Sequence, residues 1–112
     1  MLRHSIDVEI AVARGDLAEV ERLLDVSAPE GLADVEGLIA RQNALLALER
    51  RDEIEAEAPS LVIPRSYIEP FALRALGWAR NAEEMILEAV ARFEAMGLTW
   101  HADQTKRSSG RT

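Results

Sequence analysis

The chain has 112 residues, carries a formal net charge of -7 and contains no cysteine. This length suits one small domain with a modest core, and the absence of cysteine excludes disulfides and thiolate metal sites. Hydrophobic residues make up 48% of the sequence, but aromatic residues only 4%. Because much of the sequence is Ala, Leu and charged residues, the composition favours an all-α fold.

Acidic residues gather in the front half of the chain. Residues 1–63 hold 14 acids and 6 bases, whereas residues 64–112 hold 6 acids and 7 bases. Because an acidic surface repels phosphate, we expect no nucleic-acid partner. No stretch approaches the ~20 continuous apolar residues of a membrane span, and the N-terminus lacks the pattern of a signal peptide. We therefore expect no membrane association and a cytoplasmic location.

The first predicted helix pair covers residues 2–26. The alternation of apolar residues from Ile6 to Val12 suits either a strand or a helix. We predict a helix, because the next segment is helical and no partner strand appears. Gly15 suits the end of this helix, and Asp16 with Glu19 suits the capped start of the second one. The run 27–31, which contains a proline and a glycine, predicts a break.

The second predicted pair covers residues 32–58, with one helix over 32–51 and a short one opening at Asp52. Gln42 and Asn43 interrupt the apolar stripe of the longer helix. One interpretation, which we favour, places both side chains at the edge of the stripe, facing solvent. The other makes them a polar lining on a concave surface.

The third predicted pair covers residues 66–97. Ser66 and Glu69 fit a capping box, while Pro70 offers a competing helix start; we choose Ser66. Gly77 lies inside this helix, where glycine costs about 1 kcal/mol relative to alanine. We expect the compensation to be close approach of another helix. Asn81 is predicted to cap the second helix of the pair.

A last short helix over 100–106 is expected to cap the stack, so that residues 1–107 form a single domain and 108–112 a disordered tail. Trp100 is expected to pack beneath this helix. Trp78 lies off the main apolar stripe and serves either packing between repeats or contact with a partner.

The third pair carries a recognisable spacing. Leu76 and Gly77 are adjacent, Ala89 follows, and an aromatic residue, Phe93, stands four positions later. This pattern resembles the tetratricopeptide repeat, a helical hairpin that stacks into arrays. The resemblance implies a TPR-like stack of about three antiparallel helix pairs with a capping helix.

Two positions depart from that repeat, because its tyrosine-like position falls on Arg80 and its closing proline position on His101. Near the C-terminus, Phe93, Met96, Gly97, Leu98, Trp100 and Ala102 form a Phe-x-x-Met-Gly-Leu-x-Trp-x-Ala stretch. With this stretch, residues 66–106 also resemble the C-terminal end of helical arrays in large bacterial signalling proteins, namely nucleotide cyclases and AAA-type regulatory ATPases. That resemblance implies a chain that is part of, or derived from, such a protein.

The sequence carries no legible reaction chemistry. His4 and His101 lie far apart and neither has a partner at ligand spacing, so we expect no metal site. No nucleophile stands on a strained turn and no glycine-rich loop cradles phosphate. We therefore predict a protein that is not an enzyme and that needs no cofactor.

These observations predict a non-enzymatic module for protein–protein interaction or regulatory scaffolding. Its partner is expected to be another protein, the domains of a parent protein, or a second copy bound through the N-terminal helix. The alternative is a small helical ligand-binding protein with a polar pocket between helix pairs. The candidate contact residues for either role are Gln42, Asn43, Trp78 and Arg80. An anion-binding bundle using Arg74, Arg80 and Arg107 is disfavoured by the net charge.

Overall fold

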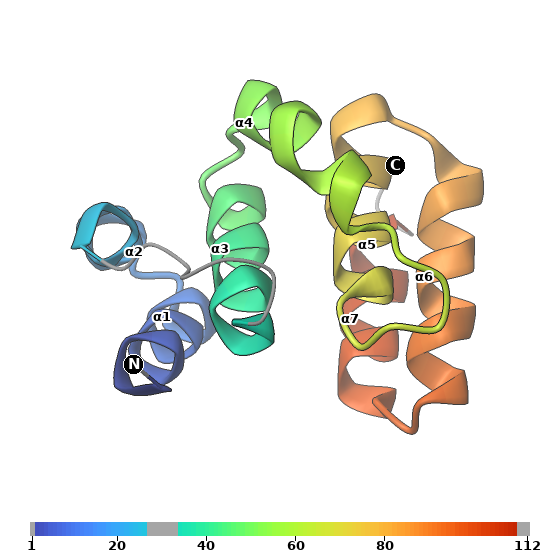
Figure 1. Cartoon of the computed structure of the whole chain (residues 1–112), viewed down its shortest axis with the longest axis horizontal. Helices are drawn as coiled ribbons and strands as arrows, with labels where there is room; N and C mark the ends of the chain where they lie inside the picture. The colour runs from blue at the N-terminus through green and yellow to red at the C-terminus, as the bar shows by residue number, and fades with distance from the viewer. Residues whose placement is uncertain (1, 27–33, 110–112) are drawn as a thin grey trace.

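The computed structural model describes residues 2–26 and 34–109, with side chains described for 6–25 and 34–107. These residues form α-helices and one 3-10 turn, and no strand occurs among them, so the predicted all-α fold is confirmed. Figure 1 shows α1, α2 and α3 on one side, α5, α6 and α7 on the other, and α4 at the junction. The elements are α1 (Leu2–Arg14), α2 (Leu17–Val26), α3 (Val35–Ala47), α4 (Arg51–Glu57), the 3-10 turn η1 (Ala58–Leu61), α5 (Glu69–Arg80), α6 (Glu83–Ala95) and α7 (Thr99–Ser109).

The helices α1 and α2 follow the predicted apolar pattern. In α1, Val8 and Ala11 are buried, and this face packs on α2 and α3. Gly15 has a φ of 71°, the left-handed conformation that favours glycine at a helix end. Asp16 Oδ1 accepts a hydrogen bond from the backbone N–H of Glu19, as the predicted cap requires. The predicted break at residues 27–31 lies outside the described residues.

The predicted helix over 32–51 is too long at its C-terminal end. α3 ends at Ala47, and Glu49, two residues later, takes a left-handed φ of 57°. The backbone N–H of Arg50 then bonds to the carbonyl of Leu45, which satisfies an end-of-helix acceptor. α4 starts at Arg51 rather than Asp52 and continues into the 3-10 turn η1.

The predicted start of the fifth helix at Ser66 is also wrong, because α5 begins at Glu69 with Pro70 in its first turn. Proline lacks the N–H that a helix start leaves unpaired anyway, so it outcompetes the capping box here. Glu69 bonds instead to the backbone N–H of Arg65.

Gly77 marks the contact between α5 and α6, as predicted. A Cβ at this position would lie 2.8 Å from Ile86 Cγ1, 3.1 Å from Ile86 N and 3.2 Å from Met85 Cβ. The missing side chain therefore lets the two helices approach closely.

Asn81 is not the N-terminal cap of α6. It has a φ of 54° and ends α5, and its backbone N–H bonds to the carbonyl of Trp78. Ala82 precedes the first residue of α6 and makes no side-chain cap. Asparagine suits both roles, since it caps helix starts and tolerates the left-handed conformation better than most residues.

The last helix is longer than predicted, covering Thr99–Ser109 rather than 100–106. Residues 108 and 109 are therefore helical and not part of a tail, while 110–112 lie outside the described residues. α7 packs on α6, and α3 packs on α5 to join the two sides of the molecule. Within the described ranges, no helix combines the length and apolar character needed to cross a bilayer.

Candidate binding groove

A groove runs between the helices α1 and α3 on one side and α5 and α7 on the other. It consists of two adjoining pockets that share Glu9, Ala13 and His101. Their volumes are about 320 and 420 Å³, which is within the range of pockets that hold ligands or side chains. We call the smaller one the polar pocket and the larger one the apolar pocket.

The apolar pocket is walled mainly by hydrophobic side chains. Its members are Ile6, Glu9, Ile10, Ala13, Glu36, Ile39, Tyr67, Phe71 and His101. Ile6, Ile10 and Tyr67 are 59%, 45% and 54% exposed. Glu9 and Glu36 supply the two carboxylates of this lining, and neither lysine nor arginine is part of it.

The polar pocket is crossed by a chain of hydrogen bonds that joins four helices. Asn43 Nδ2 donates to the Glu9 carboxylate at 3.1 and 3.3 Å, and Asn43 Oδ1 accepts from Arg74 Nη2 at 2.7 Å. Arg74 Nη1 reaches Thr105 Oγ1 at 3.5 Å, and Thr105 donates to the carbonyl of His101 at 2.7 Å. We call Glu9, Asn43, Arg74 and Thr105 the polar relay. The relay links α1, α3, α5 and α7 at the base of the groove.

The two charges of the relay are partly desolvated. Burial raises the pKa of the Glu9 carboxyl, while the hydrogen bond from Asn43 and the charge of Arg74 act in the opposite direction. Burial lowers the pKa of Arg74 to about 10, so the guanidinium stays charged at neutral pH. The guanidinium also lies 5.2 Å from the ring centroid of Phe93 and 5.5 Å from that of Phe71, within the range of cation–π attraction.

His101 belongs to this aromatic cluster. Its ring lies 4.9 Å from Phe71, 5.3 Å from Phe93 and 5.0 Å from Trp100. Burial and the nearby charge of Arg74 lower the pKa of His101 to about 4, and its Nδ1 is buried without a hydrogen-bond partner. The imidazole is therefore neutral at pH 7 and packs as an aromatic ring.

Trp100 does not pack beneath the last helix as expected. It is 60% exposed and lines the polar pocket at the mouth of the groove. Its ring edge rests on His101 rather than in the core. The core under α7 is instead closed by Ala102 and Thr105, which are both buried.

Of the four candidate contact residues, Asn43 alone lines the groove. Asn43 is 5% exposed and Gln42 is 0% exposed, so the interpretation that both face solvent is wrong. Asn43 matches the alternative, a polar lining on a concave surface. Gln42 points to α4, where its Nε2 donates to Glu57 Oε1 at 3.1 Å.

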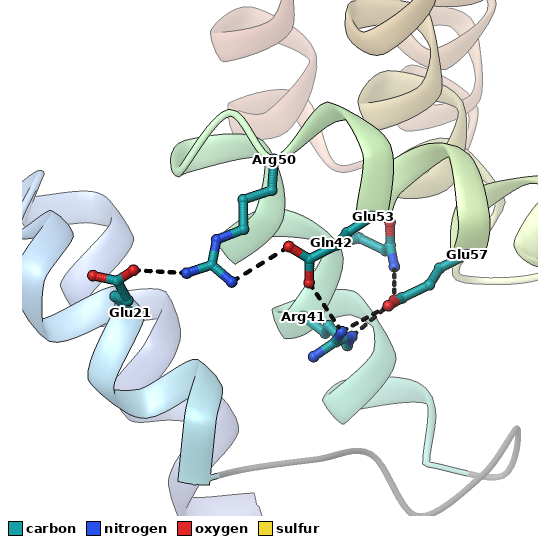
Figure 2. Close-up of polar contacts among 6 residues, drawn as sticks. All are labelled: Glu21, Arg41, Gln42, Arg50, Glu53 and Glu57. Atoms are coloured by element: carbon teal, nitrogen blue, oxygen red, sulfur yellow. Dashed lines mark hydrogen bonds and ion pairs between the residues drawn. The ribbon is translucent and has the colours of Figure 1, made fainter.

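Gln42 is part of a cluster of charged side chains that fixes α4 on its neighbours. Figure 2 shows one connected network, in which Arg41 and Gln42 bind Glu57 and Arg50 bridges two glutamates. Arg41 makes paired bonds of 2.7 and 2.6 Å to Glu57. Glu53 joins the two arginines, with N–O distances of 3.7 Å to Arg41 and 3.4 Å to Arg50, and Arg50 also binds Glu21. These bonds tie α2, α3 and α4 together and explain Gln42 as a packing residue.

Trp78 and Arg80 also lie away from the groove, at the contact between α4 and α5. Arg51 stacks over the Trp78 ring at 4.5 Å and donates to the carbonyl of Ala79 at 2.7 Å. Arg80 Nε donates to both oxygens of Glu55 at 3.1 Å. Trp78 thus serves packing between helices, which was one of its two predicted roles.

Among the described side chains, no group of three or more His, Asp or Glu residues is arranged to hold a metal ion. The side chain of His4 lies outside the described set. A further pocket of about 470 Å³ near Ser66, Glu69 and Arg92 is separated from the groove and borders the loop before α5. There Glu69 is buried and bound by the N–H of Arg65 and by Arg92, so we assign it to anchoring that loop.

Sequence reasoning did not identify Glu9, Tyr67 or the packing of Trp100 as parts of one surface. Arg74 appeared only as a member of a disfavoured anion site. One signal was present: Arg74 lies between Leu73 and Ala75 in a helix whose neighbours are apolar, so its charge had to find a partner. Comparison of the chain with protein-family models, curated proteins and solved structures finds no match.

Proposed function

We propose that this protein is a non-enzymatic binding module whose groove receives a segment of a partner protein. The observation that carries this proposal is the clustering of exposed hydrophobic side chains. Eight large hydrophobic residues are exposed among the described ones, and four of them line the groove. These four are Ile6, Ile10, Tyr67 and Trp100. Exposed apolar surface gathered around a concavity is typical of a recognition site.

The proposal includes a TPR-like arrangement of the helices. The close approach of α5 and α6 at Gly77 supports it, since this contact corresponds to the small residue of the resembling repeat. The buried positions of Ala89 and Phe93 support it further. A stack of this kind is curved and presents one concave face, which is where a scaffold module in a bacterial signalling protein would bind its partner.

The occupant in this proposal is a segment of another protein, either a separate partner or the remainder of a parent protein. The first helix supports such a contact. Val8 and Ala11 of α1 are buried against the rest of the molecule, whereas Ile6 and Ile10 remain exposed and available to a partner. A second copy bound through α1 is the homo-oligomeric version of the same proposal.

Peptide selection tests the proposal. Peptides are selected from a random library on the immobilised protein, and their binding is mapped by amide chemical shifts. We expect the shifts to fall on α1, α5 and α7, and the double variant Ile6→Ser/Tyr67→Ser to weaken binding by about tenfold. Leu87→Ser is the matched control, because Leu87 is 56% exposed on α6 and lies outside the groove lining. Shifts confined to other surfaces, or equal losses in both variants, would contradict the proposal.

A second candidate function is binding of a small polar ligand. The polar pocket favours it, because Asn43, Arg74 and Thr105 converge there with Gln104 in the same lining. A fragment screen by NMR separates the two candidates. Fragments that shift the Trp100 indole signal, with no selected peptide mapping to the groove, would favour the small-ligand function.

A further inference from the structure

We infer that the segment bound in the groove is cationic and amphipathic, with an apolar side chain against Ile6, Ile10 and Tyr67 and a lysine or arginine against the carboxylate of Glu9. This inference rests on the proposed function and specifies the chemistry of its partner. It is carried by three features of the groove, which concern the bonding of Glu9, the charge of the apolar pocket and the charge of the surrounding surface.

Glu9 has unused capacity for a cationic partner. Within the described part of the chain, its direct hydrogen bonds come from the amide of Asn43. Asn43 also binds Arg74, so this amide stands between the two charges, and no direct ion pair joins Glu9 and Arg74 among the described side chains. A carboxylate offers about four acceptor positions, and it is bound most strongly by charged donors. A lysine or arginine would supply them.

The charge of the apolar pocket points the same way. Glu9 and Glu36 line this pocket without a basic side chain, and Arg74 lines only the polar pocket. Phe71 is part of the wall of the apolar pocket, and its ring also lies beneath the Arg74 guanidinium. An apolar segment that enters this pocket therefore displaces water from the carboxylates of Glu9 and Glu36, which is unfavourable. A positive charge on the segment offsets this cost.

The overall charge of the chain reinforces this preference. The net charge is -7, with 14 acids and 6 bases in residues 1–63, which supply α1 and α3, and 6 acids and 7 bases in residues 64–112, which supply α5 and α7. An acidic surface speeds the approach of a cationic segment and slows that of an anionic one. Glu9 also lines both pockets, so a cation bound to it is placed beside the apolar contacts rather than remote from them.

The test uses two synthetic peptides of about twelve residues with leucines at helical spacing. In one peptide the remaining positions are lysine, and in the other they are glutamate. We expect the lysine peptide to bind in the groove at least about tenfold more tightly at low salt, with the difference shrinking as salt rises. Equal affinities for the two peptides, both mapped to the groove, would overturn the inference and leave the proposed function intact.

Charge variants locate the effect. Glu9→Gln keeps the shape of the side chain and should weaken binding of the lysine peptide by about five- to tenfold. Glu84→Gln removes an equal charge at an exposed position of α6 and should change the binding less than about twofold. Glu36→Lys is a second variant at an exposed position, where a fold defect is not expected, and it should shift preference towards the glutamate peptide. Equal effects of Glu9→Gln and Glu84→Gln would overturn the assignment of Glu9. Shifts of either peptide that fall entirely outside the groove would refute the proposed function itself.

Discussion

Arg74 donates a hydrogen bond of 2.7 Å from Nη2 to the side-chain oxygen of Asn43, and this bond connects α3 to α5. The two residues are 31 positions apart in the chain. Because the other side of the same amide binds Glu9 on α1, the contact orients three helices at once. The groove between them therefore depends on a polar contact in addition to apolar packing.

Replacing Asn43 by alanine should destabilise the protein by about 2–3 kcal/mol. The variant leaves the Glu9 carboxylate and the Arg74 guanidinium partly buried without the amide that joins them, and an unpaired buried group costs more than a hydrogen bond contributes. Urea unfolding followed by circular dichroism measures the free energy. Gln104→Ala, a half-exposed polar residue of the same pocket, is the control and should cost less than about 0.5 kcal/mol. A loss for Asn43→Ala as small as that of the control would show that the relay does not stabilise the fold.

His101 should make stability depend on pH between about 6.5 and 4. Its pKa falls from the ordinary 6.5 to about 4 in the folded protein, so below pH 6.5 the unfolded chain binds a proton that the folded chain does not. The contribution of His101 to the free energy of unfolding is therefore most favourable above pH 6.5 and decreases as pH falls towards 4. The whole shift corresponds to roughly 3 kcal/mol, and because the ring is only partly buried we expect about half of that.

Urea unfolding at pH 7 and pH 4.5 measures this loss, with His101→Gln as the comparison. Glu9 opposes the trend, because its raised pKa favours the folded state as pH falls. The difference between the wild type and His101→Gln at the two pH values isolates the histidine. Equal pH dependence in both proteins would contradict the neutral, packed imidazole.

Gly77→Ala should destabilise the protein by about 1–2 kcal/mol, although alanine favours helix by about 1 kcal/mol. The added Cβ would lie 2.8 Å from Ile86 Cγ1, closer than packed atoms tolerate. A double-mutant cycle with Ile86→Ala measures the coupling, since removing Cγ1 should relieve part of the clash. Additive losses in the cycle would show that the contact between α5 and α6 at this point is looser than the structure indicates.

Local sequence signals predicted the elements well where the chemistry was unambiguous. Gly15 favours a helix end and Asp16 a helix start, and the predicted end of α1 and start of α2 agree with the structure. Asn81 has two preferences, as a helix-start cap and as a left-handed helix end, and the structure adopts the second, at the end of α5. Pro70 and the capping box at Ser66 competed in the same way. Local rules rank such alternatives weakly, because tertiary packing decides between them.

The groove was harder to predict because its residues come from helices far apart in the chain. Arg74 stands out locally as a charge between apolar neighbours, but Glu9 does not, and only the packing of α3 on both α1 and α5 makes the two residues neighbours of one amide. Trp100 is expected beneath the last helix, yet in the structure it is 60% exposed and lines the polar pocket. Periodicity shows which face of a helix is apolar, but it does not show which faces meet.

Glu49→Gly should stabilise the protein by about 0.5–1 kcal/mol. Glu49 is exposed and adopts a φ of 57° after the end of α3, a conformation that costs an L-residue roughly 1–2 kcal/mol and glycine almost nothing. Part of this gain is offset by the greater freedom of glycine in the unfolded chain. The sign of the effect distinguishes the structure from the sequence prediction of a helix over 32–51. In that longer helix, glycine at position 49 would cost about 1 kcal/mol, as Glu88→Gly in the exposed middle of α6 should. Unfolding free energies of the two variants, measured side by side, decide between a helix that ends at Ala47 and one that continues.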